Sequence, residues 1–197
     1  MHGKCNTQRP EQVGSHRRED DGSGIAGVTL LELLAVLCIA SILAVMALPD
    51  LGKLLSRKSL SSQADKIALS LHRARDLAME QGHDWKVVFH PAEGTWVCFG
   101  DADGDSEMDE TEQRLGPDRL DRKVCFGCVS GTGPNGTVVP GDGISFVDNR
   151  ISYSPLGCCN SGSIYIRSED RSMAIRVLPA SGAVRMWEYR GAWEALP

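Results

Sequence analysis

A run of acidic side chains near the middle of the chain has the spacing of a cation-binding loop. Acids occupy positions one, three, five, nine and twelve of a twelve-residue stretch, namely Asp101, Asp103, Asp105, Asp109 and Glu112. In the calcium loop of an EF-hand, oxygen atoms at this spacing converge on a hard cation and a bidentate glutamate completes its coordination. The pattern therefore predicts Ca²⁺ as an optional ligand, and it requires no cofactor.

Two features separate this stretch from an EF-hand. The sixth position, where an EF-hand has a glycine for its sharp turn, is Ser106, and Gly104 lies two places earlier. The flanking sequence has the character of strand and loop, whereas an EF-hand needs two helices. A solvated acidic loop without a metal is the competing interpretation, because like charges repel and prefer water.

Seven cysteines raise the question of disulfides. Cys5 lies in a polar N-terminal segment and Cys38 in an apolar run, and an oxidising compartment would favour one or two disulfides among the other five. Five is an odd number, so at least one of them stays free or pairs between chains. Zinc binding and free thiols remain alternatives, and the spacing does not define the pairing. The disulfide candidates are Cys98, Cys125, Cys128, Cys158 and Cys159.

One carboxylate interrupts an otherwise apolar segment near the N-terminus. Residues 28–48 are almost wholly apolar, and Glu32 is the one charge among them. A helix rises about 1.5 Å per residue, so this segment would extend roughly 30 Å, the thickness of a bilayer core. A charge inside such a helix is costly, so we expect Glu32 to have a partner.

The segment Gly27-Val-Thr-Leu-Leu-Glu32, with its apolar continuation to Pro49, resembles the N-terminus of type IV pilins and type II secretion pseudopilins. The resemblance implies that a prepilin peptidase cleaves between Gly27 and Val28 and methylates the amine of Val28. It also implies that Glu32 pairs with the N-terminal amine of a neighbouring subunit during assembly. Pro49 fits the family pattern, whereas Val28 departs from it, because the first mature residue is usually Phe.

This resemblance defines an expected domain organisation. Residues 1–27 form the leader, 28–48 a transmembrane and filament-core helix, 49–82 its amphipathic continuation, and 83–197 a periplasmic β domain. The distribution of Lys and Arg around the apolar segment would instead place the C-terminal side in the cytoplasm. The resemblance implies the opposite orientation: a single-pass inner-membrane protein whose C-terminal domain is periplasmic.

The sequence after Pro49 predicts an amphipathic helix that continues the apolar segment, with Pro49 as the candidate kink position. Gly82 is a typical residue at a helix C-terminus. Polar residues separate an apolar stripe with spacings of three and four, formed by Leu60, Ala64, Ile67, Leu71, Ala74 and Ala78.

From Asp84 onward the pattern is typical of β structure, which makes the chain α+β. Two hairpins are expected, with turns at 91–94 and 179–182, and residues 129–143 form a loop rich in Gly and Pro. The predicted strands are 85–90, 95–99, 122–126, 143–147, 150–154, 163–167, 173–178 and 183–189. This order resembles the minor pseudopilin H and FimT-like branch, where the helix leads into an antiparallel β-sandwich-like domain. Acid-rich loops after the second strand recur in FimT-like proteins, which gives the acidic stretch a third explanation.

The resemblance implies a structural function. The expected protein is a minor pseudopilin of a type II secretion system, near the tip of the periplasmic pseudopilus, which supports protein export across the outer membrane. Its partners would be other major and minor pseudopilins or pilins, the prepilin peptidase and inner-membrane lipid. No catalysis is expected, since the mature chain shows no G-x-S-x-G, H-E-x-x-H or Walker motif.

The alternative is a FimT-like minor pilin of a type IV pilus, with a role in DNA uptake. That role needs an exposed basic surface, because backbone phosphates attract Arg and Lys. The formal net charge of −5 argues against a general nucleic-acid binder, although it does not exclude a local basic patch. The candidate residues for such a patch are Arg167, Arg171, Arg176, Arg185 and Arg190.

Overall fold

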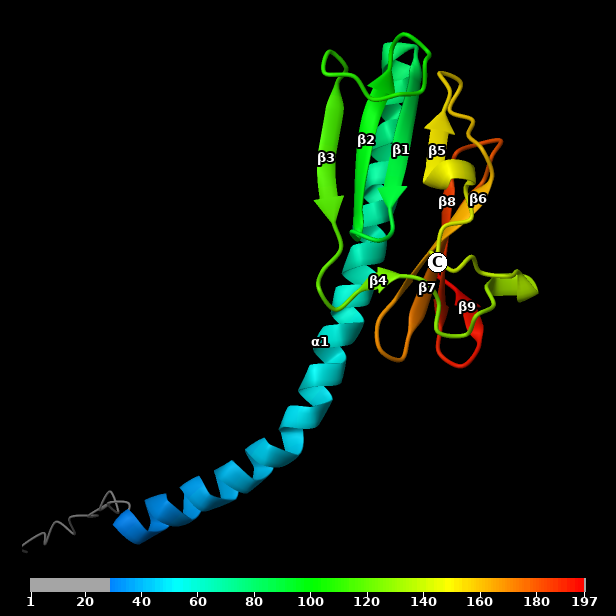
Figure 1. Ribbon diagram of the computed structural model, residues 1–197. Coiled ribbons are helices and arrows are strands. Elements are labelled where there is room, and N and C mark those ends of the chain that lie inside the picture. The colour runs from blue at the N-terminus through cyan, green and yellow to red at the C-terminus, as the bar shows by residue number, and fades with distance from the viewer. Residues whose placement is uncertain (1–28, 197) are drawn as a thin grey trace, which may run out of the picture. The chain divides into compact units, whose positions relative to one another are not determined.

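The computed structural model describes residues 29–196 of the chain, and within this range the side chains of residues 45–57 are not described. The chain divides into two compact units, Met1–Met46 and Ala47–Pro197. One helix, α1 (Leu30–Gln81), begins in the first unit and ends in the second (Figure 1). The predicted leader and cleavage site lie outside the described residues, and α1 continues through Pro49, whose side chain is not described.

Thr29 caps the N-terminus of α1. Its Oγ1 accepts a hydrogen bond from the backbone amide of Glu32 at 3.2 Å, and its carbonyl accepts one from the amide of Leu33 at 3.1 Å. Threonine followed three residues later by glutamate is the sequence pattern of a capping box. The first turn is also where the helix dipole favours a carboxylate, so Glu32 has a local role that the sequence analysis missed.

The apolar side chains of the first unit are exposed over their whole described length, from Leu30 at 83% to Leu43 at 62%. A helix with apolar residues on all sides is normally buried in lipid or protein. Within the part of the chain that the structure describes, no helix combines the length and apolarity needed to cross a membrane. The predicted span, residues 28–48, extends into side chains that are not described, so it stays a prediction.

In the second unit, α1 presents the predicted apolar stripe to the protein interior. Leu60, Ile67 and Leu71 are at most 1% exposed, and the alanines of the stripe are fully buried. The helix ends at Gln81, as predicted, and Gly82 follows with φ of +76°. The Gly82 amide donates to the carbonyl of Ala78 at 3.0 Å, so it satisfies one of the last helical carbonyls.

A four-stranded antiparallel sheet follows the helix, in the order β3-β2-β1-β5 (Figure 1). Its strands β1 and β2 form the first predicted hairpin, with Asp84 opposite Asp101 at the open end and His90 opposite Thr95 at the turn. The sheet consists of β1 (Asp84–His90), β2 (Thr95–Asp101), β3 (Arg114–Arg119) and β5 (Arg150–Tyr153).

The second sheet is also antiparallel and has the strand order β4-β6-β7-β8-β9. Its hairpin between β7 and β8 turns where the sequence predicts, and Gly182 has φ of +63° in that turn. The sheet consists of β4 (Cys125–Phe126), β6 (Gly162–Arg167), β7 (Ser172–Val177), β8 (Val184–Tyr189) and β9 (Trp193–Ala195).

Two predicted strands need correction, and two observed strands were not predicted. Residues 143–147 form no strand: Ile144 makes a single bridge to Ile164, and a 3₁₀ turn, Val147–Asn149, follows, with positive φ at Asp148 and Asn149. Of the predicted strand 122–126, only the two residues of β4 are in a strand. Strands β3 and β9 were not predicted, because β3 contains Gly116 and Pro117 with no β-branched residue, and β9 has only three residues.

The helix and both sheets of the second unit share one hydrophobic core. Side chains from α1, from the inner face of each sheet and from the connecting segment around Phe146 belong to a single buried cluster. The largest members, Trp85, Trp96 and Tyr153, are fully buried. The predicted α+β arrangement with antiparallel sheets is confirmed, and the core fixes where the loops between strands emerge.

Candidate functional site

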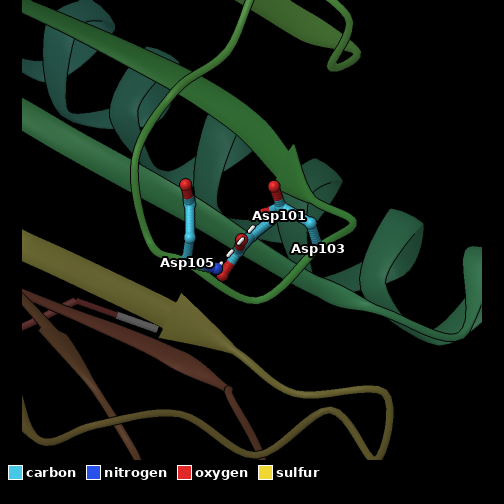
Figure 2. Close-up of side chains that lie close together, drawn as sticks. All are labelled: Asp101, Asp103 and Asp105. Carbon is cyan, nitrogen blue, oxygen red and sulfur yellow. Dashed lines mark hydrogen bonds between the residues drawn. The ribbon is translucent and has the colours of Figure 1, made fainter.

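The acidic loop connects β2 to the edge strand β3, and part of the predicted ligand set comes together there. Carboxylate oxygens of Asp101, Asp103 and Asp105 all lie within 4.8 Å of one another. Figure 2 shows Asp101 at the end of β2 and the other two in the loop, where the Asp105 amide donates to a carboxylate oxygen of Asp103 at 3.2 Å. These three residues form the candidate cation site.

Glu112, the predicted closing ligand, binds backbone amides of the loop. One carboxylate oxygen of Glu112 accepts a hydrogen bond from the Ala102 amide at 3.0 Å, and the other accepts one from the Asp109 amide at 3.2 Å. Glu112 therefore links the beginning and end of the loop by capping backbone amides. The structure brings three of the five predicted ligands together, because Glu112 is engaged with amides and Asp109 does not join the group. The five-residue calcium set stays a prediction.

Asp101 already has a cation beside it. The Lys86 ammonium on β1 forms an ion pair with Asp101, with side-chain exposures of 5% and 1%, and also donates to the hydroxyl of Ser106. The second oxygen of Asp101 accepts from the amides of Gly104 at 3.0 Å and Ser106 at 3.3 Å. Burial alone would raise the pKa of Asp101, but the hydrogen bonds from Lys86 and the two amides outweigh it and hold the pKa below its usual range.

A second basic side chain fixes the same loop. The guanidinium of Arg150, on β5, donates to the carbonyl of Ser106 at 2.8 Å. Lys86 and Arg150 thus hold the loop from two strands of the four-stranded sheet. Neither residue was predicted for the site, because only the pairing of β1 with β2 and of β5 with β1 brings them to the acidic loop.

The predicted disulfides are not formed in the described part of the chain, where all the cysteines are free thiols. Cys98 is buried in β2, Cys125 is exposed on β4, and the pair Cys158-Cys159 lies in the segment after β5. The thiols of Cys158 and Cys159 point toward the carbonyls of Ala180 and Leu178, respectively. The described residues give no metal-ligand group that contains a cysteine.

Burial controls the acidity of these thiols. Burial of Cys98 raises its pKa to about 12, and the nearby Asp118 carboxylate adds to the effect. Burial, followed by the neighbouring Cys158, raises the pKa of Cys159 to about 11. A reactive thiol needs a lowered pKa, so neither cysteine has the environment of a nucleophile.

The C-terminal arginines do not act as one basic surface. Glu188 on β8 accepts hydrogen bonds from both Arg171 and Arg190 at 2.6 Å, so the two cations share one carboxylate. The Arg190 hydrogen bond and the nearby positive charges lower the pKa of Glu188. Arg167, Arg176 and Arg185 form no ion pair with any described residue.

Comparison with known proteins now places the chain. The sequence profile of the family described as "Type II transport protein GspH" matches residues 63–181. This match covers more than half of the chain. The chain belongs to the GspH family. The GspH-matching region begins in the buried part of α1 and ends in the turn between β7 and β8, so it contains most of the core of the second unit.

Two solved structures that resemble this GspH-family chain come from one protein. Both are the minor pseudopilin EpsH from the type 2 secretion system of Vibrio cholerae. One is 11% identical, covers 65% of this chain and 95% of that chain, and has a TM-score of 0.43. The other is also 11% identical, covers 72% of this chain and 95% of that chain, and has a TM-score of 0.38. No curated protein sequence matches the chain significantly.

The GspH match does not reach the N-terminal segment in which processing is predicted. Gly27 and Val28 lie outside both the matched region and the described residues, and Glu32 lies outside the matched region. The membership of the pilin-like family predicted from that segment is nevertheless supported by a different part of the chain. The two parts lead to the same family independently.

Proposed function

We propose that this GspH-family protein is a minor pseudopilin of a type II secretion system. The family match over residues 63–181 is the observation that carries the proposal. The protein would reside in the inner membrane through residues 28–48, with its second unit in the periplasm, and then enter a periplasmic pseudopilus near its tip. Its role is structural, in support of export across the outer membrane, and it has no catalytic step.

Assembly requires processing and a partner for Glu32. In the proposal a prepilin peptidase cleaves after Gly27, the amine of Val28 becomes methylated, and Glu32 pairs with the terminal amine of another major or minor pseudopilin. The exposed apolar side chains of α1 support packing against lipid first and against neighbouring subunits after assembly.

Intact mass and N-terminal sequencing of the protein from host membranes test the processing step. We expect a chain that begins at N-methylated Val28. A chain that retains the leader, or begins near Asp50, would remove the pilin-like assembly from consideration.

A deletion strain tests the secretion role. We expect loss of export of the host's secreted proteins, restored by the intact gene, while pili and natural transformation are unaffected. Normal secretion with loss of pili or DNA uptake would support the FimT-like alternative. The described structure does not favour that alternative, because two of its five candidate arginines are paired with Glu188.

We also propose calcium as an optional ligand of the acidic loop, at millimolar concentrations. The convergence of Asp101, Asp103 and Asp105 supports it, whereas Lys86 competes because its ammonium already neutralises Asp101. In the Lys86→Gln variant the competing charge is gone. We therefore expect added CaCl₂ to raise the melting temperature of this variant more than that of the wild type.

The control for calcium is magnesium, which demands a small octahedral site and dehydrates reluctantly. MgCl₂ should therefore raise the melting temperature of each protein by less than CaCl₂ does. If CaCl₂ changes neither the melting temperature nor the heat of titration in both proteins, the loop is a solvated acidic loop without a metal.

A further inference from the structure

Two arginines face each other on the outer surface of the five-stranded sheet. Arg176 on β7 lies directly opposite Arg185 on β8 in the register of these strands. Their strand neighbours Ile175, Val177, Val184 and Met186 belong to or pack against the core, so alternation along the strands places both arginines on the opposite face. Arg176 is half-buried and Arg185 is exposed.

Like charges directly opposite each other in a sheet destabilise it. The same sheet contains a second like-charge pair, Glu188 opposite Glu194, and there the fold supplies counter-charges: Arg171 and Arg190 both bind Glu188. No described residue supplies a carboxylate to Arg176 or Arg185. The two arginines therefore lack a counter-charge among the described residues, and an anionic partner could supply it.

Among residues 29–196, no strand pairs with the sheet edge beside this arginine pair. Strand β9 pairs only with Trp187–Tyr189 of β8, and beyond it a single hydrogen bond joins the Leu196 amide to the Met186 carbonyl. Val184 and Arg185 thus have a strand neighbour on one side only, β7. A hollow of about 360 Å³ lies at this edge, lined by Val184, Arg185, Met186, Trp187, Ala195 and Leu196.

We propose that the Arg176–Arg185 pair and the adjoining edge of β8 form a docking site for an extended acidic segment of another protein subunit. Such a segment would add its backbone beside Val184 and Arg185, place apolar side chains in the hollow, and direct carboxylates to the two guanidinium groups. Charge complementarity and the open edge select this occupant. The source, a neighbouring pilin-like subunit, rests on the proposed function.

Binding of a defined peptide tests the site directly. The full chain, purified in detergent micelles, is titrated into a short fluorescent peptide of alternating Glu and Val, and anisotropy is recorded at low and at raised salt. We expect salt-sensitive binding that falls by about tenfold or more in the Arg176→Gln/Arg185→Gln variant. The matched control is Arg122→Gln/Lys123→Gln, which removes two exposed charges elsewhere and should bind as the wild type does.

Charge reversal provides a second readout. The Arg176→Glu/Arg185→Glu variant should lose the Glu–Val peptide and bind a Lys–Val peptide. The single variant Arg185→Gln should also melt at a higher temperature than the wild type, because it removes the repulsion without disturbing a buried side chain. A lower melting temperature for Arg185→Gln would show that the pair is not under repulsion and would contradict the proposal.

Three binding outcomes would overturn the docking site. They are absence of peptide binding at low salt, an equal loss in the Arg122→Gln/Lys123→Gln control, and displacement of the peptide by duplex DNA with the same arginine dependence. The last result would identify a nucleic-acid site.

Secretion assays separate this inference from the proposed function. If the deletion strain secretes normally, the secretion role fails whatever the peptide does. If deletion abolishes secretion but the Arg176→Gln/Arg185→Gln variant restores it fully, the secretion role holds and the docking partner is not part of that assembly.

Discussion

At the scale of single residues, the buried ion pair between Lys86 and Asp101 determines the conformation of the acidic loop. Both side chains are almost completely buried, and Asp101 also accepts hydrogen bonds from two loop amides. Removing one partner of a buried pair leaves an uncompensated charge in a place that water cannot reach. The loop therefore depends on an internal cation whether or not calcium binds.

Asp101→Asn should lower the free energy of unfolding by about 3–5 kcal/mol, because the Lys86 ammonium stays buried without its counter-charge. Urea unfolding measures the change. The matched control is Asp118→Asn. Asp118 forms an ion pair with Lys66, with 2.8 Å between the Lys66 Nζ and an Asp118 carboxylate oxygen, and the side chains of Asp118 and Lys66 are 39% and 41% exposed, respectively. In that variant the free energy of unfolding should fall by less than about 1 kcal/mol. Equal losses in the two variants would contradict the importance of burial.

The lowered pKa of Asp101 also predicts an acid dependence. A carboxylate with a depressed pKa in the folded state stabilises the protein fully above its unfolded pKa, about 3.9 for Asp. This contribution is lost as the pH falls through the folded value, so the wild type should lose stability below about pH 4. Asp101→Asn should show a shallower loss in the same range, measured by urea unfolding at successive pH values.

Cysteine reactivity offers a further test at this scale. Cys98 is buried with a pKa raised to about 12, whereas Cys125 is exposed on β4. Under native conditions at mildly alkaline pH, iodoacetamide should label Cys125 and leave Cys98 unmodified, and peptide mass spectrometry distinguishes the two. Labelling of Cys98 as rapid as that of Cys125 would show that β2 opens readily. If neither cysteine is labelled because both are in disulfides, the predicted disulfides would be supported instead.

At the scale of elements, α1 has two faces with different energetics in its second half. Leu71 is fully buried in the core, and Leu69, two residues earlier, is 69% exposed. Leu71→Ala should reduce stability by about 2–5 kcal/mol through lost burial and a cavity. Leu69→Ala on the same helix should change it by about 0.5 kcal/mol or less. Chemical denaturation of both variants measures the contrast, and similar losses would mean that the stripe is wrongly assigned.

The end of α1 depends on the conformation of Gly82. Its φ of +76° belongs to the left-handed region, and a Cβ at this position would meet no neighbouring atom. Gly82→Ala should therefore cost about 1–2 kcal/mol from backbone strain alone. Gly141, also in open space and without a positive φ, provides the control, and its replacement by Ala should leave the melting temperature unchanged.

At the scale of the whole molecule, the hydrophobic core and the proposed assembly residue belong to different units. The hydrophobic core lies entirely within the second unit, while Glu32 lies in the first. A defect in assembly should therefore be separable from a defect in folding.

Glu32→Gln tests this separation. The melting temperature of the variant should equal that of the wild type, while secretion by a strain that carries only the variant should be lost, because the proposed pairing with a neighbour's amine needs the carboxylate. Glu80→Gln, an exposed carboxylate near the other end of the same helix, should leave both properties unchanged. Normal secretion by the Glu32→Gln strain would contradict the assembly role.

Regular patterns in the sequence were sufficient to predict much of the fold. The spacing of Leu60, Ile67 and Leu71 predicted the buried stripe of α1, and alternating apolar residues with turn residues predicted both hairpins, since helical and strand periodicities are local properties of the chain. The strand β3 escaped prediction, because Gly116 and Pro117 oppose strand formation locally and only pairing with β2 along the sheet edge compensates.

The sequence alone determined the family-like N-terminus, the position of the acidic loop and the order of helix before sheets, because each depends on residues adjacent in the chain. Only the tertiary structure decided which charges meet. It brought Lys86 and Arg150 to the acidic loop, removed Glu112 from the candidate ligands, and set Arg176 opposite Arg185. The physical reason is that strand register and core packing join residues far apart in the chain, and local periodicity carries no information about that register.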